Sequence, residues 1–254
     1  MRSSRLSTVK TQFRDNALLV GLDKPEKRNA MDEQMVEELH SVLDGAMRGD
    51  PKILVIHSLV ENVFVSGADI GELLHRDADS AMRSINAGLL EKLEKFRWPT
   101  IAVIDGYALG GGCELAMACD FRLASTRARF GQPELDLGIL AGAGGNWRLP
   151  QLVGISMARR LLYTGEIIDA QKALSVGLID DVYPPEELMN SAMKLVETIS
   201  RRSWRALELT KLSLGANRHP TTTFDIIAQA LLFESDDKKV RMQAFLDRKT
   251  KRSH

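Results

Sequence analysis

The sequence predicts an α/β fold followed by a helical C-terminal region, and three observations indicate this. Short apolar runs such as Ile53–Ile56 and Ile101–Ile104 suit buried strands. Stretches with helical spacing of apolar residues alternate with these runs. After Glu186 only helical spacing remains. We therefore expect a mixed core over residues 1–185 and a helical region over residues 186–254.

Composition narrows the classes of protein that this chain can be. Its 254 residues suffice for one large domain or two small ones, and the formal net charge is zero. A neutral chain is not drawn to nucleic acid or to an anionic membrane, and no apolar stretch approaches transmembrane length. The two cysteines, Cys113 and Cys119, are too few for a disulfide framework, and the five histidines lack metal-ligand spacing. We expect a cytoplasmic protein with no metal, no nucleic acid partner and no membrane partner.

The N-terminal third reads as a hairpin, a charged loop and a helix. Residues 8–13 and 17–22 predict two strands around Asp15 and Asn16. A charged loop follows over residues 24–29. Apolar residues recur at helical spacing over residues 32–47, and Gly49 and Pro51 end that helix.

The middle of the chain alternates strands with helices. A strand is expected at Ile53–Ile56, and the Phe64–Ile70 segment passes from strand to loop at Gly67. A helical stretch over residues 79–96 ends before the strand Ile101–Ile104. The later elements are expected as strands over residues 121–124 and 178–183, and as helices over residues 150–163, 170–175, 188–199, 204–214, 224–233 and 238–249.

Three consecutive glycines, Gly110–Gly112, separate the strand at 101–104 from a buried helix that Glu114 opens. The start of a helix leaves backbone N–H groups without partners, and such groups bind an anion or a developing negative charge. Two carboxylates, Glu114 and Glu134, flank this region in sequence. Paired carboxylates near oriented N–H donors indicate acid/base chemistry on a carbonyl compound.

Other glycine-based sites are excluded by spacing. A dinucleotide fingerprint requires a third glycine where this chain has Leu115 or Trp147. Neither a phosphate-binding loop ending in Gly-Lys-Ser/Thr nor a Gly-x-Ser-x-Gly nucleophile elbow occurs.

Several motifs resemble the enoyl-CoA hydratase/isomerase (crotonase) superfamily. They are Phe64–Ile70, Gly106–Ala116 and Gln132–Glu134, and the resemblance covers essentially the whole chain. It implies a crotonase-like spiral of ββα units over residues 1–185 that carries the catalytic site. It also implies that the helical region joins subunits into homotrimers, often paired as hexamers.

The resemblance also implies roles for single residues. The N–H groups of Ala68 and Gly111 would form an oxyanion hole for the thioester oxygen, since fixed donors stabilise its negative charge. Glu114 would activate water, and Glu134 would deliver a proton to the α-carbon. The substrate, an acyl-CoA, needs no further cofactor. The implied substrate-binding residues are Lys27, Arg28, Ala30, Ala68, Asp69, Ile70, Gly142, Phe245 and Arg248, although Lys27, Arg28 and Arg248 could equally be solvated charges.

Details of the motifs favour a hydratase within the superfamily. Dienoyl-CoA isomerases carry aspartates where this chain has Glu114 and Gly142, and many simple isomerases lack the first glutamate. The alternatives are a double-bond isomerase that mainly uses Glu134, and a non-catalytic protein that binds acyl-CoA or RNA. The chain also departs from the usual family residues, which puts the choice of substrate in question; the departures are at Gly71, Ala141, Asn146 and Trp147.

Overall fold

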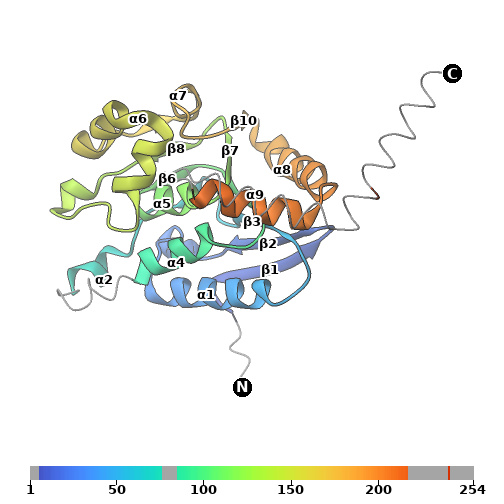
Figure 1. Ribbon diagram of the computed structural model, residues 1–254. Helices are drawn as coiled ribbons and strands as arrows, with labels where there is room; N and C mark the ends of the chain where they lie inside the picture. The colour runs from blue at the N-terminus through green and yellow to red at the C-terminus, as the bar shows by residue number, and fades with distance from the viewer. Residues whose placement is uncertain (1–5, 76–84, 217–239, 241–254) are drawn as a thin grey trace. The chain divides into compact units, whose positions relative to one another are not determined.

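The computed structural model describes residues 6–75, 85–216 and 240 (Figure 1). Contacts within the chain divide it into two compact units, residues 1–198 and residues 199–254. The expected division after residue 185, and the role of the C-terminal region in assembly, stay predictions. The expected helices over residues 224–233 and 238–249 lie outside the described residues, apart from Val240.

Two sheets form the framework of the first unit. A six-stranded sheet has the order β1-β2-β3-β5-β7-β10, and a four-stranded sheet has the order β4-β6-β8-β9. The strands of the first sheet are β1 Val9–Arg14, β2 Ala17–Leu22, β3 Ile53–Ser58, β5 Thr100–Ile104, β7 Phe121–Ser125 and β10 Asp181–Tyr183. Those of the second are β4 Val63–Val65, β6 Tyr107–Leu109, β8 Arg129–Gly131 and β9 Ile168–Asp169.

Successive strand pairs divide themselves between the two sheets. The pairs β3/β4, β5/β6 and β7/β8 each send their first strand to the larger sheet and their second strand to the smaller one. Neighbouring turns pair in parallel in both sheets, while β1 with β2 and β8 with β9 are antiparallel. This is the spiral of ββ units that the resemblance implied, and it confirms the predicted α/β class.

Helices follow or cover these strand pairs (Figure 1). Helix α1 buries the apolar positions predicted from its spacing, and it packs against α4 and β1. None of the helices in the described part of the chain is both long and apolar enough to cross a bilayer. Their bounds are α1 Glu33–Met47, α2 Ile70–Leu74, α4 Ile85–Glu94, α5 Gly111–Met117, α6 Gly145–Thr164, α7 Ala170–Ser175, α8 Pro185–Ser200 and α9 Trp204–Ala216, with 3₁₀ turns η1 Pro25–Lys27 and η2 Glu134–Leu137.

The sequence-based expectation was wrong about several short elements. It missed α2 and all the strands of the smaller sheet except β4, because runs of two or three residues show no periodicity. Helix α5 begins at Gly111 instead of Glu114, and α6 begins at Gly145 instead of Pro150. Pro150 lies inside α6, whose path is broken again where Gly154 adopts a non-helical φ of 74°. Of the helix expected over residues 79–96, the structure describes α4 and the residues after it.

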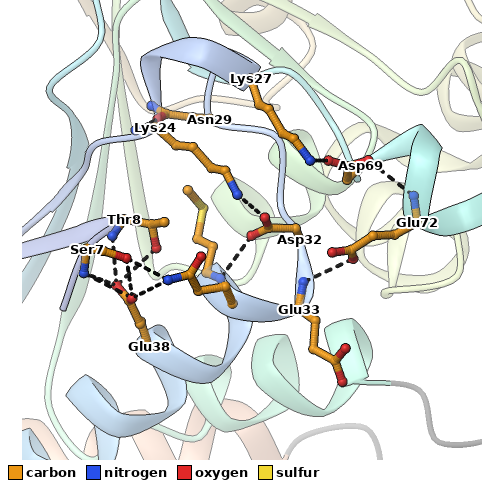
Figure 2. A network of polar contacts seen from close by, with 12 residues as sticks. Ser7, Thr8, Lys24, Lys27, Asn29, Asp32, Glu33, Glu38, Asp69 and Glu72 are labelled. Atoms are coloured by element: carbon orange, nitrogen blue, oxygen red, sulfur yellow. Dashed lines mark hydrogen bonds and ion pairs between the residues drawn. The ribbon is translucent and has the colours of Figure 1, made fainter. Parts of the chain in front are cut away.

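A polar network fixes the loop that precedes α1 (Figure 2). The side chain of Asp32 caps α1 by accepting from the Met35 N–H at 3.0 Å, and it forms a buried ion pair with Lys24. Asn29 accepts from the Lys24 N–H at 2.8 Å and donates to the Phe64 carbonyl at 3.1 Å. These contacts tie the loop to the end of β4, which is where the glycine of the Phe64–Ile70 motif follows.

Glu38 anchors the start of β1 to α1 (Figure 2). Its carboxylate accepts the backbone N–H groups of Ser7, Thr8 and Val9 at 2.9 to 3.1 Å, and the hydroxyls of Ser7 and Thr8 at 3.0 Å. Partial burial works against ionisation, but these hydrogen bonds outweigh it and lower the pKa of Glu38.

We expect Glu38→Gln to lower the free energy of unfolding by about 1–2 kcal/mol, because an amide group would face N–H donors. The pKa of Glu38 is lower in the folded state than in the unfolded state. Its stabilisation is therefore present above the unfolded pKa and is lost as the pH falls through the folded pKa. Urea denaturation at several pH values measures this, with the exposed neighbour Glu37→Gln as the control. A difference that grows on acidification would contradict the assignment.

Candidate active site

A cavity of about 430 Å³ opens where the Phe64–Ile70 motif meets the Gly106–Ala116 motif. Glu114 and Glu134 both line it, together with Ala68, Gly111 and Gly142. The rest of its described wall is mainly apolar and comes from α2, α4, η2 and the loop after η2. These apolar residues include Ile70, Leu73, Ile85, Leu137, Ile139 and Leu140.

The glycine triplet allows α5 to pack directly against β4. A Cβ atom on Gly112 would lie 2.3 Å from the Val65 carbonyl oxygen, so no side chain fits there. Gly110 has a positive φ of 49°, and a Cβ on it would lie 2.8 Å from a carboxylate oxygen of Glu134. The triplet is therefore required by the close approach of backbone to backbone and of backbone to Glu134.

This packing brings the N–H groups of Ala68 and Gly111 together. A Cβ on Gly111 would lie 3.6 Å from the Ala68 nitrogen. Gly111 is the first residue of α5, whose first N–H groups have no partner within the helix. The bridge between Met31 and Ala68 uses the Gly67 carbonyl and the Asp69 N–H, so it leaves the Ala68 N–H free. Two neighbouring donors thus remain without a partner among the described residues.

Asp69 holds the segment that carries Ala68 (Figure 2). Its carboxylate caps α2 by accepting from the Glu72 N–H at 3.2 Å, and it forms an ion pair with Lys27. The hydrogen bond from Lys27 lowers the pKa of Asp69, so the carboxylate stays ionised. The orientation of the Ala68 N–H therefore depends on contacts made one residue further along.

Glu114 lies on α5 with only 3% of its surface exposed. Its Oε1 accepts from the backbone N–H groups of Ala143 and Gly145, each at 2.8 Å. Burial raises the pKa of Glu114, while the two N–H groups and the charge of Arg148 oppose that rise. Two backbone N–H groups thus hold Oε1 of a carboxyl group that lines the cavity.

Glu134 begins the 3₁₀ turn η2 on the opposite wall. Burial, reinforced by the nearby charge of Glu114, raises its pKa to about 7. The buried side-chain amide of Gln132 lies beside Glu134, and with its nitrogen turned toward the carboxylate, as hydrogen bonding requires, it donates to the two oxygens at 3.0 and 3.1 Å. The two glutamates therefore differ in environment: backbone donors hold Glu114, whereas one side-chain amide and a neighbouring negative charge surround Glu134.

The structure brings half of the sequence-predicted site residues to one cavity. Ala68, Ile70 and Gly142 line the cavity with the two glutamates and Gly111. The head group of Lys27 is engaged by Asp69, and the guanidinium of Arg28 lies 5.6 Å from the centre of the Tyr107 ring. Ala30 directly precedes the bridge residue Met31. Phe245 and Arg248 lie outside the described residues.

Sequence reasoning missed three residues that contact or surround Glu114 and Glu134: Ala143, Gly145 and Gln132. Ala143 and Gly145 act through backbone N–H groups, which no side-chain pattern reveals. Gln132 belongs to a motif that the sequence had singled out, so its proximity to Glu134 could have been predicted. Trp147 was expected to change the pocket, but it is not among the described residues that line the cavity.

Comparison with known proteins agrees with this geometry. The family model described as enoyl-CoA hydratase/isomerase matches residues 12–252. A short-chain-enoyl-CoA hydratase from Clostridium acetobutylicum is 34% identical, with 96% of each chain covered. A crotonyl-CoA hydratase from Syntrophomonas wolfei is 39% identical, with 90% of each chain covered.

A solved structure extends this agreement to the fold. The crystal structure of an enoyl-CoA hydratase from Bacillus anthracis superposes with a TM-score of 0.91 at 29% identity, covering 95% of this chain and 97% of the other. Matches of this extent, in sequence and in fold, cover both motifs and both sheets described above. The chain therefore belongs to the enoyl-CoA hydratase/isomerase family.

Proposed function

We propose that this protein is an enoyl-CoA hydratase, which adds water to the double bond of a trans-2-enoyl-CoA thioester. One observation carries the proposal: two carboxyl groups in different environments face one cavity beside a pair of unpartnered backbone N–H groups. The names of the relatives, short-chain-enoyl-CoA hydratase and crotonyl-CoA hydratase, support the same activity.

In this mechanism the thioester oxygen accepts from the N–H groups of Ala68 and Gly111. Attack of water on the β-carbon moves electrons toward that oxygen, and fixed donors stabilise the resulting negative charge without reorganising. Removing one such donor typically raises the barrier by about 3–4 kcal/mol. Their position between α5 and β4 keeps them away from competing hydrogen bonds.

The two glutamates divide the acid/base work. Glu114, held by two N–H groups, is the better candidate for the ionised base that removes a proton from water as its oxygen bonds to the β-carbon. Glu134, with a pKa of about 7, holds a proton in part of the molecules at neutral pH and gives it to the α-carbon. Glu114 then carries a proton and Glu134 lacks one, so a proton must pass through solvent before the next cycle.

The cavity favours a hydrocarbon acyl group. Its described wall presents aliphatic side chains from α2, η2 and the following loop. Coenzyme A enters as part of the substrate, so the proposal requires no separate cofactor and no metal.

We also propose that the protein works as a homotrimer or a pair of trimers. Several large apolar side chains of the first unit are exposed, and contiguous exposed apolar surface marks an interaction site. These are Leu135, Leu137 and Leu140 near the cavity, with Tyr163 and Ile167 on α6 and the loop that follows it. A cytoplasmic location remains a prediction from the sequence.

We expect Glu114→Gln and Glu134→Gln each to lower kcat by about 10²-fold or more, which is the usual contribution of a general acid or base. The double variant should lose less than the sum of the two effects, because the residues act in one step. Steady-state hydration assays with crotonyl-CoA and longer enoyl-CoA esters measure kcat, and Glu61→Gln on the exposed surface is the control. Full hydratase activity in Glu114→Gln would argue for an isomerase that relies on Glu134, and a wild type without turnover on any enoyl-CoA would exclude both activities.

Gly111→Ala should abolish turnover in a protein that still folds. The added methyl group would meet only ordinary contacts, at 3.6 Å or more, but it would lie over the Ala68 nitrogen where the thioester oxygen must bind. Gly111→Val should act in the same way. Circular dichroism and thermal melting test the fold, and Gly45→Ala, which meets nothing within 4 Å in α1, is the matched control. Persistent activity with an unchanged melting temperature would show that Gly111 does not bind the oxygen.

Analytical ultracentrifugation should show a trimer or a hexamer. Truncation before Lys238 should weaken coenzyme A binding together with assembly, since the family resemblance brings Phe245 and Arg248 near a coenzyme A bound across subunits. Removal of residues 250–254 alone is the control, because it retains both residues. A fully active monomer, or a truncated protein with unchanged affinity for coenzyme A, would refute the shared site.

A further inference from the structure

Arg148 is a buried arginine in the first turns of α6, with 4% of its surface exposed. Its Nη1 donates to the Ala143 carbonyl at 2.8 Å, and its Nη2 pairs with Glu94 Oε2 at 3.0 Å. The guanidinium carbon lies 3.9 Å from the centre of the Trp147 ring. Its Nε is buried and has no hydrogen-bond partner among the residues that the structure describes.

The guanidinium and the glycine turn before α6 interlock. Gly144 adopts a φ of 115°, and a Cβ on it would lie 2.0 Å from Arg148 Nη1. The arginine therefore fills the space that a side chain at residue 144 would need. The conformation of the turn and the position of the guanidinium are therefore matched to each other.

That turn is the element that holds Glu114. The Ala143 carbonyl accepts from Arg148, and the Ala143 N–H donates to Glu114 Oε1. The same carboxylate oxygen also accepts from the Gly145 N–H. We propose that Arg148, stacked on Trp147 and anchored by Glu94, is a positioning residue that holds Glu114 as an oriented, ionised base. This inference rests on the proposed hydratase function.

Electrostatics act in the same direction as the geometry. Arg148, behind the turn, is the charged side chain that shifts the pKa of Glu114, and the charge of Glu114 raises the pKa of Glu134 in turn. The positive charge of Arg148 lowers the pKa of Glu114 and so opposes the effect of burial. Loss of that charge would raise the pKa of Glu114 and reduce the fraction of molecules in which it can accept a proton.

A purely stabilising role explains this arrangement poorly. A buried ion pair contributes little or no net stability compared with apolar residues of similar volume, because both charges lose hydration. Here the guanidinium also leaves Nε without a partner in the described part of the chain, which adds to that cost. A rigid, charged support behind the base accounts for the retained arginine.

Trp147 contributes to the same support through its contact with Arg148. It was one of the positions at which the chain departs from the usual family residue, glutamine. The structure stacks its indole against the guanidinium of Arg148, a contact worth more when it is shielded from water. We therefore expect this departure to alter the support of Glu114 more than the choice of acyl group.

Glu94 extends the support to α4. This helix ends at Glu94, and its first residues, Ile85–Ala87, line the cavity. The ion pair between Arg148 and Glu94 therefore joins the turn that holds Glu114 to a helix that forms part of the substrate wall.

The test compares Arg148→Met with Arg148→Lys in kcat, KM and the pH profile of kcat. Arg148→Met should lower kcat by about 10²-fold, as small misplacements of catalytic groups do, with KM changed much less. Its acid limb should move to higher pH, because Glu114 becomes harder to ionise. Arg148→Lys keeps the charge but loses the planar fork and the stacking, so kcat should fall while the acid limb stays in place.

Arg122→Met is the matched control. Arg122 is also buried, donates to two backbone carbonyls and pairs with Asp180, but it contacts neither glutamate. The Arg122→Met variant should lose thermal stability and keep the wild-type kcat and the acid limb of the wild-type pH profile. If Arg148→Met behaves like this control, Arg148 is only structural and the proposal is overturned. If Arg148→Met does not fold, wild-type kcat in Arg148→Lys overturns it equally.

A titration without turnover separates this inference from the proposed function. Glutamate carboxyl groups labelled with ¹³C report the pKa of Glu114 by NMR, with Glu114→Gln to assign the signal. The pKa should be higher in Arg148→Met than in the wild type. A wild type that hydrates no enoyl-CoA would refute the proposed function alone, whereas an identical titration of Glu114 in both proteins would refute the role of Arg148.

Discussion

The close packing of α5 against β4 is the constraint on which the rest of the site depends. Gly112 allows a backbone approach that any Cβ would prevent, since that atom would lie 2.3 Å from the Val65 carbonyl. The approach brings Gly111 close to the Ala68 nitrogen, and neither N–H has a partner among the described residues. It also places Glu114 one turn further along the same helix, facing the same cavity. One packing contact thus determines where the donors and the first carboxylate lie.

Burial of Glu114 creates the second requirement. A carboxylate with 3% exposure must find donors within the protein, because an unsatisfied buried charge is very costly. The turn before α6 supplies two N–H groups. This turn needs glycine at residue 144, because the Arg148 guanidinium occupies the space that a side chain there would fill. Gly144 and Gly145 therefore serve the buried charge of Glu114, whereas Gly112 serves a packing contact.

The polar contacts around Ala68 come from described residues that do not line the cavity. Asp69 caps α2 and pairs with Lys27, and Asn29 joins the preceding loop to the end of β4 (Figure 2). These residues constrain the peptide of Ala68 without occupying the space that a substrate would need. The same separation applies to Arg148, which donates to the turn that holds Glu114 and is not among the described residues that line the cavity. Rigid support behind a small set of exposed polar groups is what preorganised catalysis requires.

The sequence by itself determined the α/β class, the long helices and strands, the paired glutamates and the glycine motifs, because these depend on local periodicity and on residue type. It could not determine that Ala143 and Gly145 hold Glu114, since backbone N–H groups have no signature in a sequence. It also missed the short strands β6, β8 and β9, which are too brief for a period to show. The contacts of Arg148 with Glu94 and Ala143 were decided only by tertiary structure, because Glu94 lies on another element and Ala143 acts through its backbone.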